Sequence, residues 1–164
     1  MSNNKKNHKV AIVMGSQSDY STMRYTQKVL KILKIKHEIK IVSAHRTPKR
    51  LYQFAKTAEK NNISVVIAGA GGSAHLPGMI AAITKVPVIG VPIESKKLKG
   101  LDSLLSIAQM PKGIPVGTVA IGKDGAINAG LFAASIIALT NSKTRKNLYL
   151  WRKKQTRSVK KKPK

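Results

Sequence analysis

Two patterns of apolar and polar residues alternate along the chain. Short runs rich in valine, isoleucine and alanine are separated by longer segments in which apolar residues recur every three or four positions. The short runs predict five strands, at residues 9–14, 38–42, 64–68, 87–91 and 116–121. Strands that alternate with helices in this way indicate a parallel α/β sheet.

The longer segments predict helices with recognisable starts. Ser18 or Asp19 can cap the first helix, and Thr47 with Pro48 can begin the second. Further helices are predicted at residues 79–85, 101–109, 125–140 and, outside the sheet, 147–155. We expect both of the first two helices to face the core. The core residues should be Met23, Leu30 and Leu33 on the first helix, and Leu51, Phe54, Ala55 and Ala58 on the second.

The segment 125–140 is apolar almost all round the predicted helix. Its large members are Ile127, Leu131, Phe132, Ile136, Ile137 and Leu139, with alanine and glycine between them. A helix of this kind must bury more than one face. We expect it to be either a central core helix or part of a subunit interface.

The length and composition fit one compact domain. The chain has 164 residues, 42% of them apolar, and we place the catalytic domain at 9–157, with basic flexible ends at 1–8 and 158–164. No apolar run approaches the roughly 20 residues of a membrane helix. The sequence has no cysteine and no recognisable targeting segment, so a cytoplasmic location is expected, and thiol nucleophiles, disulfides and cysteine metal sites are excluded.

The charge is strongly positive, with 31 lysines and arginines against 6 acidic residues and a formal net charge of +25. Nucleic acid, membrane surfaces and phosphorylated small molecules all attract such a chain. Most of the excess positive charge comes from lysine, and aromatic residues make up only 4% of the chain. Specific recognition of nucleic acid favours bidentate arginines and stacking aromatic rings, so this composition argues against it. The basic segment after Asn141 is either a solvated extension or a binding arm.

Polar residues gather directly after the first three predicted strands, at 15–19, 43–46 and 69–75. Ligands of open α/β sheets bind beyond the carboxyl ends of the strands, where the strand order reverses. With the strand order 2-1-3-4-5, these three loops meet over one crevice. Their convergence predicts a binding site there, although Ser18 and Asp19 taken alone could be only a helix cap.

Several kinds of chemistry are poorly supported. Residues 69–74 match G-x-G-x-x-A and Glu94 follows the next strand, but the next helix is expected to begin only near Met79, which weakens a dinucleotide fingerprint. The glycines are better explained as a loop whose backbone amides approach a small ligand. There is no P-loop, and the few acidic residues are scattered. We therefore expect neither ATP hydrolysis nor metal catalysis.

Histidine remains as the group for proton transfer. His45 and His75 lie in the predicted loops, and imidazole can act as acid and as base near neutral pH. His45 stands between Ser43 and Arg46, at the end of a strand. Arg46 offers a fixed cation for a phosphate, and Ser43 a hydroxyl beside it.

A resemblance to a known family rests on several motifs. They are VMGSQSD (13–19), SAHRTP (43–48) and AGAGGSAHLPGM (68–79), followed by VPVIGVP and GLDSLLSIAQMPKGIPVGTVAIG. From Val10 to about Gln155 the chain resembles the N5-carboxyaminoimidazole ribonucleotide mutase family, the class I catalytic subunit of phosphoribosylaminoimidazole carboxylase. The resemblance implies a three-layer flavodoxin-like domain with an extra C-terminal helix. It also implies that the protein forms a homo-octamer and uses neither an organic cofactor nor a metal.

The reaction implied by this resemblance belongs to de novo purine (IMP) biosynthesis. An isomerase moves the carboxylate of the ribonucleotide from N5 to C4 through enzyme-held CO2, and gives 4-carboxy-5-aminoimidazole ribonucleotide. His45 would be the acid and base, and the Gly71–His75 loop would close over the carboxylate and the imidazole. The residues implied to bind the substrate are Ser16 and Asp19 for the ribonucleotide, Ser18, Ser43 and Arg46 for its phosphate, and Gly71, Gly72, Ser73 and His75 in the closing loop.

Other functions remain as alternatives. The related carboxylases that use free CO2 resemble Ser-Ala-His-Lys-Gly at this point, whereas this chain has Arg46 and reads Ser-Ala-His-Arg-Thr-Pro, which favours the mutase. A basic nucleic-acid-binding domain would explain the charge but not three converging loops. A nucleotide-binding oxidoreductase would explain the glycines but not SAHRTP.

Overall fold

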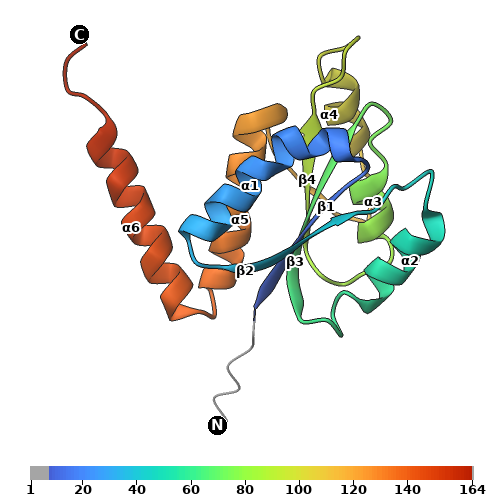
Figure 1. The fold of residues 1–164 in the computed structure, drawn as a ribbon, viewed down its shortest axis with the longest axis horizontal. Helices are drawn as coiled ribbons and strands as arrows, with labels where there is room; N and C mark the ends of the chain where they lie inside the picture. Colours follow the sequence, from blue (N-terminus) through green and yellow to red (C-terminus); the bar gives the residue numbers. More distant parts are fainter. Residues whose placement is uncertain (1–7, 164) are drawn as a thin grey trace.

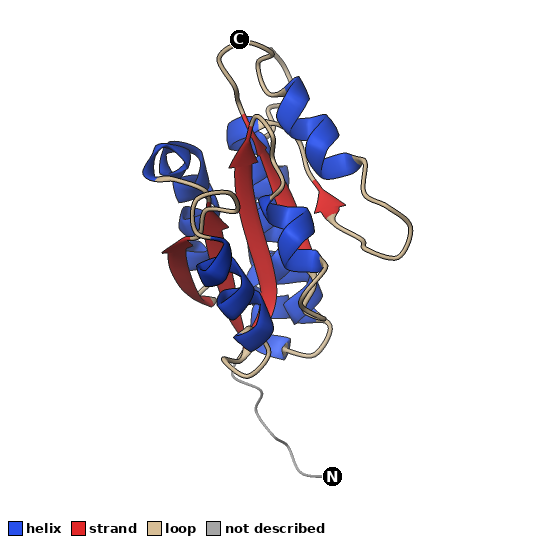
Figure 2. Cartoon of the chain, turned by 90° about the vertical axis from the view of Figure 1, so that its right-hand side faces the viewer, coloured by secondary structure: helices blue, strands red, loops and turns tan. Residues whose placement is uncertain are grey.

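The computed structural model describes residues 8–163, which form one five-stranded sheet with helices on both faces (Figures 1 and 2). All pairings are parallel and the strand order is β2-β1-β3-β4-β5, so the predicted sheet is confirmed. The predicted flexible end at 1–8 falls, except for His8, outside the described residues. The strands are β1 (Lys9–Met14), β2 (Lys36–Ile41), β3 (Ile63–Gly71), β4 (Val88–Ile93) and β5 (Gly117–Thr118).

The helices complete a three-layer arrangement. They are α1 (Tyr20–Ile32), α2 (Pro48–Thr57), α3 (Leu76–Ala81), α4 (Leu101–Ala108), α5 (Gly122–Ala138) and α6 (Ser142–Ser158), with a short 3-10 turn, η1 (Gln17–Asp19), before α1. Helices α1 and α5 cover one face of the sheet, and α2, α3 and α4 cover the other. Among residues 8–163, no helix combines the length and the apolar character that crossing a bilayer requires.

The central strands are buried on both faces, which explains their continuous apolar runs. Along β1, Val10, Ile12 and Met14 pack toward α1 and α5, whereas Ala11 and Val13 pack toward α2. Full burial of one such aliphatic side chain stabilises the fold by about 1.5–3 kcal/mol. The core positions predicted on the first two helices are confirmed as buried: Met23, Leu30, Leu33, Leu51, Phe54, Ala55 and Ala58.

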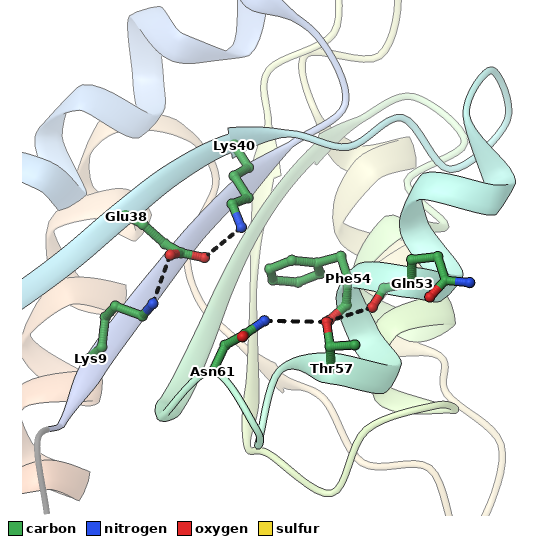
Figure 3. Close-up of polar contacts among 7 residues, drawn as sticks. All are labelled: Lys9, Glu38, Lys40, Gln53, Phe54, Thr57 and Asn61. Carbon is green, nitrogen blue, oxygen red and sulfur yellow. Dashed lines mark hydrogen bonds and ion pairs between the residues drawn. The ribbon is translucent and has the colours of Figure 1, made fainter.

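The edge strand β2 carries charges instead of a continuous apolar run. Glu38 accepts hydrogen bonds from Lys9 on β1 at 2.8 Å and forms an ion pair with Lys40 at 3.0 Å (Figure 3). Burial acts to raise the pKa of Glu38, but the two lysines lower it overall. Lys40 also lies 5.6 Å from the centre of the Phe54 ring. Charged side chains at this edge disfavour pairing with a strand of another molecule.

Several predicted boundaries are wrong. Helix α3 begins at Leu76 rather than near Met79, because Leu76 is buried and Pro77 at the second helical position has a backbone angle that suits a first turn. Helix α6 begins at Ser142, where the Asn141 side chain accepts the Thr144 amide at 2.9 Å. Strand β5 pairs over two residues only, because α5 already starts at Gly122.

The first helix is also capped differently from the prediction. Asp19 is the residue before α1, but neither its side chain nor that of Ser18 accepts a hydrogen bond from the first turn of this helix. The Asp19 carboxylate instead accepts the Ser16 amide at 3.1 Å. The polar residues of this loop are therefore turned toward the end of the sheet.

Helix α5 has two apolar faces with different surroundings. Its alanines and glycines are buried against the sheet and α1, so this face belongs to the core. On other faces, Phe132 and Leu139 remain 47% and 75% exposed. Helix α6 packs on α5 through Leu148, and Asn147 donates to the Leu33 carbonyl at 2.9 Å. Beyond this contact α6 extends away from the body of the domain (Figure 1).

Gly90 in β4 allows close packing of α4 against the sheet. A Cβ atom at this position would overlap the Ile107 side chain of α4 and would lie 3.1 Å from Val116 Cγ1. Since Ile107 is buried, we expect Gly90→Ala to lower the free energy of unfolding by about 1–3 kcal/mol, as overpacked core substitutions do. Thermal and urea denaturation of the variant measure this loss.

Gly117 in the neighbouring strand β5 supplies the matched control. The nearest atom to a Cβ there is Phe132 Cε1 at 3.2 Å, and this ring is partly exposed and has room to move. Gly117→Ala should therefore cost less than about 1 kcal/mol. Equal stability of the two variants would contradict the packing described for β4.

Candidate active site

Three loops meet at the carboxyl edge of the sheet around a cavity of about 420 Å³, a volume typical of small-molecule sites. Ser18 does not line this cavity; its exposed Oγ lies 2.6 Å from Ser16 Oγ. The predicted residues that the fold does bring to the cavity are Ser16, Asp19, Ser43, His45, Arg46, Gly71, Gly72, Ser73 and His75.

The loop after β1 contributes a carboxylate. The Ser16 amide donates to Asp19 Oδ2 at 3.1 Å, which turns the carboxylate toward the cavity wall. Burial raises the pKa of Asp19, although the hydrogen bonds from Ser16 oppose the rise. A carboxylate that is partly desolvated gains from further donors. Hydroxyl groups of a bound ligand would provide them.

The loop after β2 contributes a guanidinium group that joins two loops. Arg46 Nε donates to the buried Ser43 hydroxyl at 3.2 Å, and Arg46 Nη2 donates to the Gly15 carbonyl at 3.0 Å. Thr47 Oγ1 accepts the Ser43 amide at 3.0 Å and so holds the start of α2 to the end of the strand. Because guanidinium carries five N–H donors, these contacts leave several for an anion.

The loop after β3 is held from the other side of the site. The Gly72 amide donates to Ser103 Oγ of α4 at 2.9 Å, and this hydroxyl donates to the Ile93 carbonyl at 2.7 Å. Gly72 has a φ of +66°, a conformation that favours glycine. The loop therefore turns tightly at Gly72 and leaves room beside the cavity at this residue.

The second and third loops meet through two imidazole rings. His45 Nε2 lies 2.9 Å from His75 Nδ1, and the two ring planes are at 87° to one another. A hydrogen bond of this kind needs one nitrogen without a proton, so at least one ring is neutral in this arrangement. Both rings are exposed at the cavity, where either can exchange a proton with a ligand.

The fourth strand contributes residues that the sequence analysis did not assign to the site. Glu94 and Ser95 follow β4 and line the cavity beside Ile93. In the sequence, Glu94 matches only the acidic position of a dinucleotide fingerprint. The signal for its position was the strand order, because the end of β4 must lie next to the end of β3.

Helix α3 begins directly after the glycine loop, so a late helix start does not exclude a dinucleotide fingerprint. The fingerprint fails for another reason: Gly69 lies inside β3, which continues to Gly71, whereas the first glycine of the fingerprint must form the turn after the strand.

A larger hollow of about 570 Å³ lies at the opposite edge of the sheet. It is bounded by the amino ends of β3 and β4 and by the end of α5, and includes Ser64, Pro87 and Thr140. The turns that contain SAHRTP and the glycine loop are not part of it. We therefore take the smaller cavity as the candidate active site.

Comparison with known proteins shows which proteins the chain resembles. The chain is 56% identical over 159 residues to the N5-carboxyaminoimidazole ribonucleotide mutase of Escherichia coli K12, covering 97% of this chain and 94% of that protein. It is 58% identical over 154 residues to the mutase of Brucella melitensis, with 94% and 95% covered. The crystal structure of Treponema denticola PurE superposes with a TM-score of 0.83 at 28% identity, over 92% of each chain.

A family match covers almost all of the described residues. The matched region is 9–158, which includes the whole sheet, the three loops of the cavity and helix α6. The chain therefore belongs to the AIR carboxylase family.

Proposed function

We propose that the chain is an N5-carboxyaminoimidazole ribonucleotide mutase, an isomerase that moves the carboxylate from N5 to C4 of the imidazole. The observation that carries this proposal is the position of His45 between the Arg46 cation and the His75 ring, on the cavity where three loops meet. Relatives with 56% and 58% identity bear the mutase name. The SAHRTP sequence around His45 favours the mutase over a carboxylase that uses free CO2.

The first step is loss of CO2 from N5. His45 as imidazolium donates a proton to the carbamate nitrogen while the N–C bond breaks, so the leaving group is a neutral amine rather than an amide anion. In the absence of substrate, the hydrogen bond between His45 Nε2 and His75 Nδ1, at 2.9 Å, orients the His45 ring. This contact is exchanged for the substrate nitrogen on binding.

The second step is recapture of CO2 by the nucleophilic ring carbon C4. A C–C bond forms, and neutral His45 then removes the C4 proton, which restores the aromatic ring and returns the histidine to its starting state. Recapture gains from effective concentration as long as CO2 stays in the cavity. The Gly71–His75 loop provides the wall on that side.

The remaining residues bind the ribonucleotide. Arg46 and Ser43 hold the phosphate, and Ser16 and Asp19 hold the ribonucleotide, with the Asp19 carboxylate accepting hydrogen bonds from the ribose hydroxyls. Ser18, which lies outside the cavity lining, contacts the Ser16 hydroxyl. The chemistry uses protons and CO2 alone, so it needs no cofactor. We also keep the homo-octamer as a prediction, supported by the exposed apolar residues on α5, Phe132 and Leu139.

His45→Asn tests the acid–base role. The variant should bind the ribonucleotide but turn over about 10² to 10⁴ times more slowly, the usual contribution of a positioned acid–base group. His37→Asn, on β2 outside the cavity, is the matched control and should keep its activity. A folded His45→Asn variant with a rate near that of the wild type would exclude this mechanism.

Arg46→Ala tests the phosphate contact. Loss of a charge-assisted partner should weaken ribonucleotide binding by roughly 2 to 4 kcal/mol, measured by calorimetry. The dephosphorylated nucleoside should bind the variant and the wild type about equally. If both ligands lose the same affinity, Arg46 acts only by joining the Gly15 and Ser43 loops, and the phosphate assignment is wrong.

Isotope labelling separates the mutase from the carboxylase. N5-carboxylated substrate is supplied in buffer that contains ¹³C-bicarbonate, and the initial product is analysed by mass spectrometry. A mutase places unlabelled carboxylate at C4 faster than label enters, because the CO2 does not leave the cavity. Substantial label in the first product, or turnover only when CO2 is added to aminoimidazole ribonucleotide, would assign the carboxylase reaction instead.

A further inference from the structure

The segment between β4 and α4 carries three lysines in four residues at the edge of the active site. Glu94 and Ser95 line the cavity, and the chain then forms a turn through Lys96, Lys97, Leu98 and Lys99 before α4 begins. We call residues 96–99 the lysine turn. All four of its side chains are exposed.

The lysine turn is held in place at both ends. Ser95 Oγ accepts the Gly100 amide at 3.1 Å and donates to Asp102 Oδ1 at 2.7 Å, so the residues before and after the turn are joined. Gly100 has a φ of +91°, and a Cβ there would overlap Ile121. Ser103, whose hydroxyl accepts the Gly72 amide, directly follows Asp102. The turn is therefore fixed to the same framework that holds the glycine loop.

The charges of the cavity wall create a need for additional cations. The lining contains two carboxylates, Asp19 and Glu94, but one guanidinium, Arg46, beside the two histidines. Each carboxylate opposes the approach of the phosphate and the carboxylate of a ribonucleotide. Within residues 8–163 the ion pairs are Lys9–Glu38 and Lys40–Glu38, so the charges of the lysine turn are not neutralised by an acidic partner.

We propose that Lys96, Lys97 and Lys99 form a cationic rim that captures the anionic substrate and directs it past Glu94 to Arg46. This inference rests on the proposed function, because it requires a substrate with at least two anionic groups. It adds a capture surface to the residues that bind and transform the substrate.

Lysine suits capture better than tight binding. Its ammonium group is strongly hydrated and sits on a flexible stem, so it attracts anions over a distance without fixing their geometry. Clefts with such charges raise association rates by about 10- to 10³-fold at low ionic strength, and salt removes the effect. Since the rim makes no contact specific to the transition state, it should change kcat/KM and leave kcat unaltered.

The test is the triple variant Lys96→Gln, Lys97→Gln, Lys99→Gln, assayed with N5-carboxylated substrate. At an ionic strength of about 10 mM its kcat/KM should be about 3- to 10-fold lower than that of the wild type, with kcat unchanged. At about 150 mM the two proteins should differ less than about twofold, because the Debye length has shortened to about 8 Å. Thermal denaturation checks that the variant is folded.

A variant with the same loss of charge at the opposite edge of the sheet is the control. Lys36, Lys60 and Lys85 are exposed at the amino ends of β2, β3 and β4, and their replacement by glutamine should leave kcat/KM within about twofold of the wild type at both salt concentrations.

The possible results distinguish a failure of the cationic rim from a failure of the proposed mutase function. Absence of turnover in the wild type contradicts the proposed function itself. With wild-type turnover established, an unchanged kcat/KM in the lysine-turn variant overturns the inference. An equal loss in the control variant overturns it as well, since total charge rather than the rim would then be responsible. A large fall in kcat would show that the turn takes part in the closed site and not in capture.

Discussion

The parallel direction of the five strands is the constraint on which the site depends. Because all strands run the same way, every carboxyl end lies at one edge of the sheet, and the loops that follow β1, β2, β3 and β4 have no other place to meet. Buried valine, isoleucine and alanine on both faces hold the central strands in this order. The chemistry at the edge therefore rests on the packing of the two cores below it.

Contacts between loops, rather than within them, give the site its geometry. Arg46 joins the second loop to the first through the Gly15 carbonyl, and His45 joins it to the third through His75. Ser103 of α4 holds the third loop from the far side. His45 thus lies where two cross-loop contacts converge, and its position requires all three loops to be folded together.

Charge is distributed unevenly over the molecule. The chain as a whole is strongly basic, yet the cavity wall contains more carboxylates than guanidinium groups. A partly buried carboxylate suits ribose hydroxyls but opposes the approach of an anion, so binding and capture make opposite demands on the same wall. The proposed division between Arg46 inside the cavity and lysines at its rim satisfies both demands.

The sequence by itself determined the class of fold, the strand order and most of the site. Strand-length apolar runs and helical periodicity depend on local residue patterns, so the sheet and the buried faces of α1 and α2 were predictable. The motifs around His45 and the glycine loop identified the residues that line the cavity. Only the tertiary structure decided where α3 and α6 begin and how short β5 is, because burial of Leu76 and pairing with β4 compete with local preference. It alone placed His75 against His45, and Glu94 on the same cavity as these rings, since contacts between residues far apart in sequence exist only once the strands have assembled.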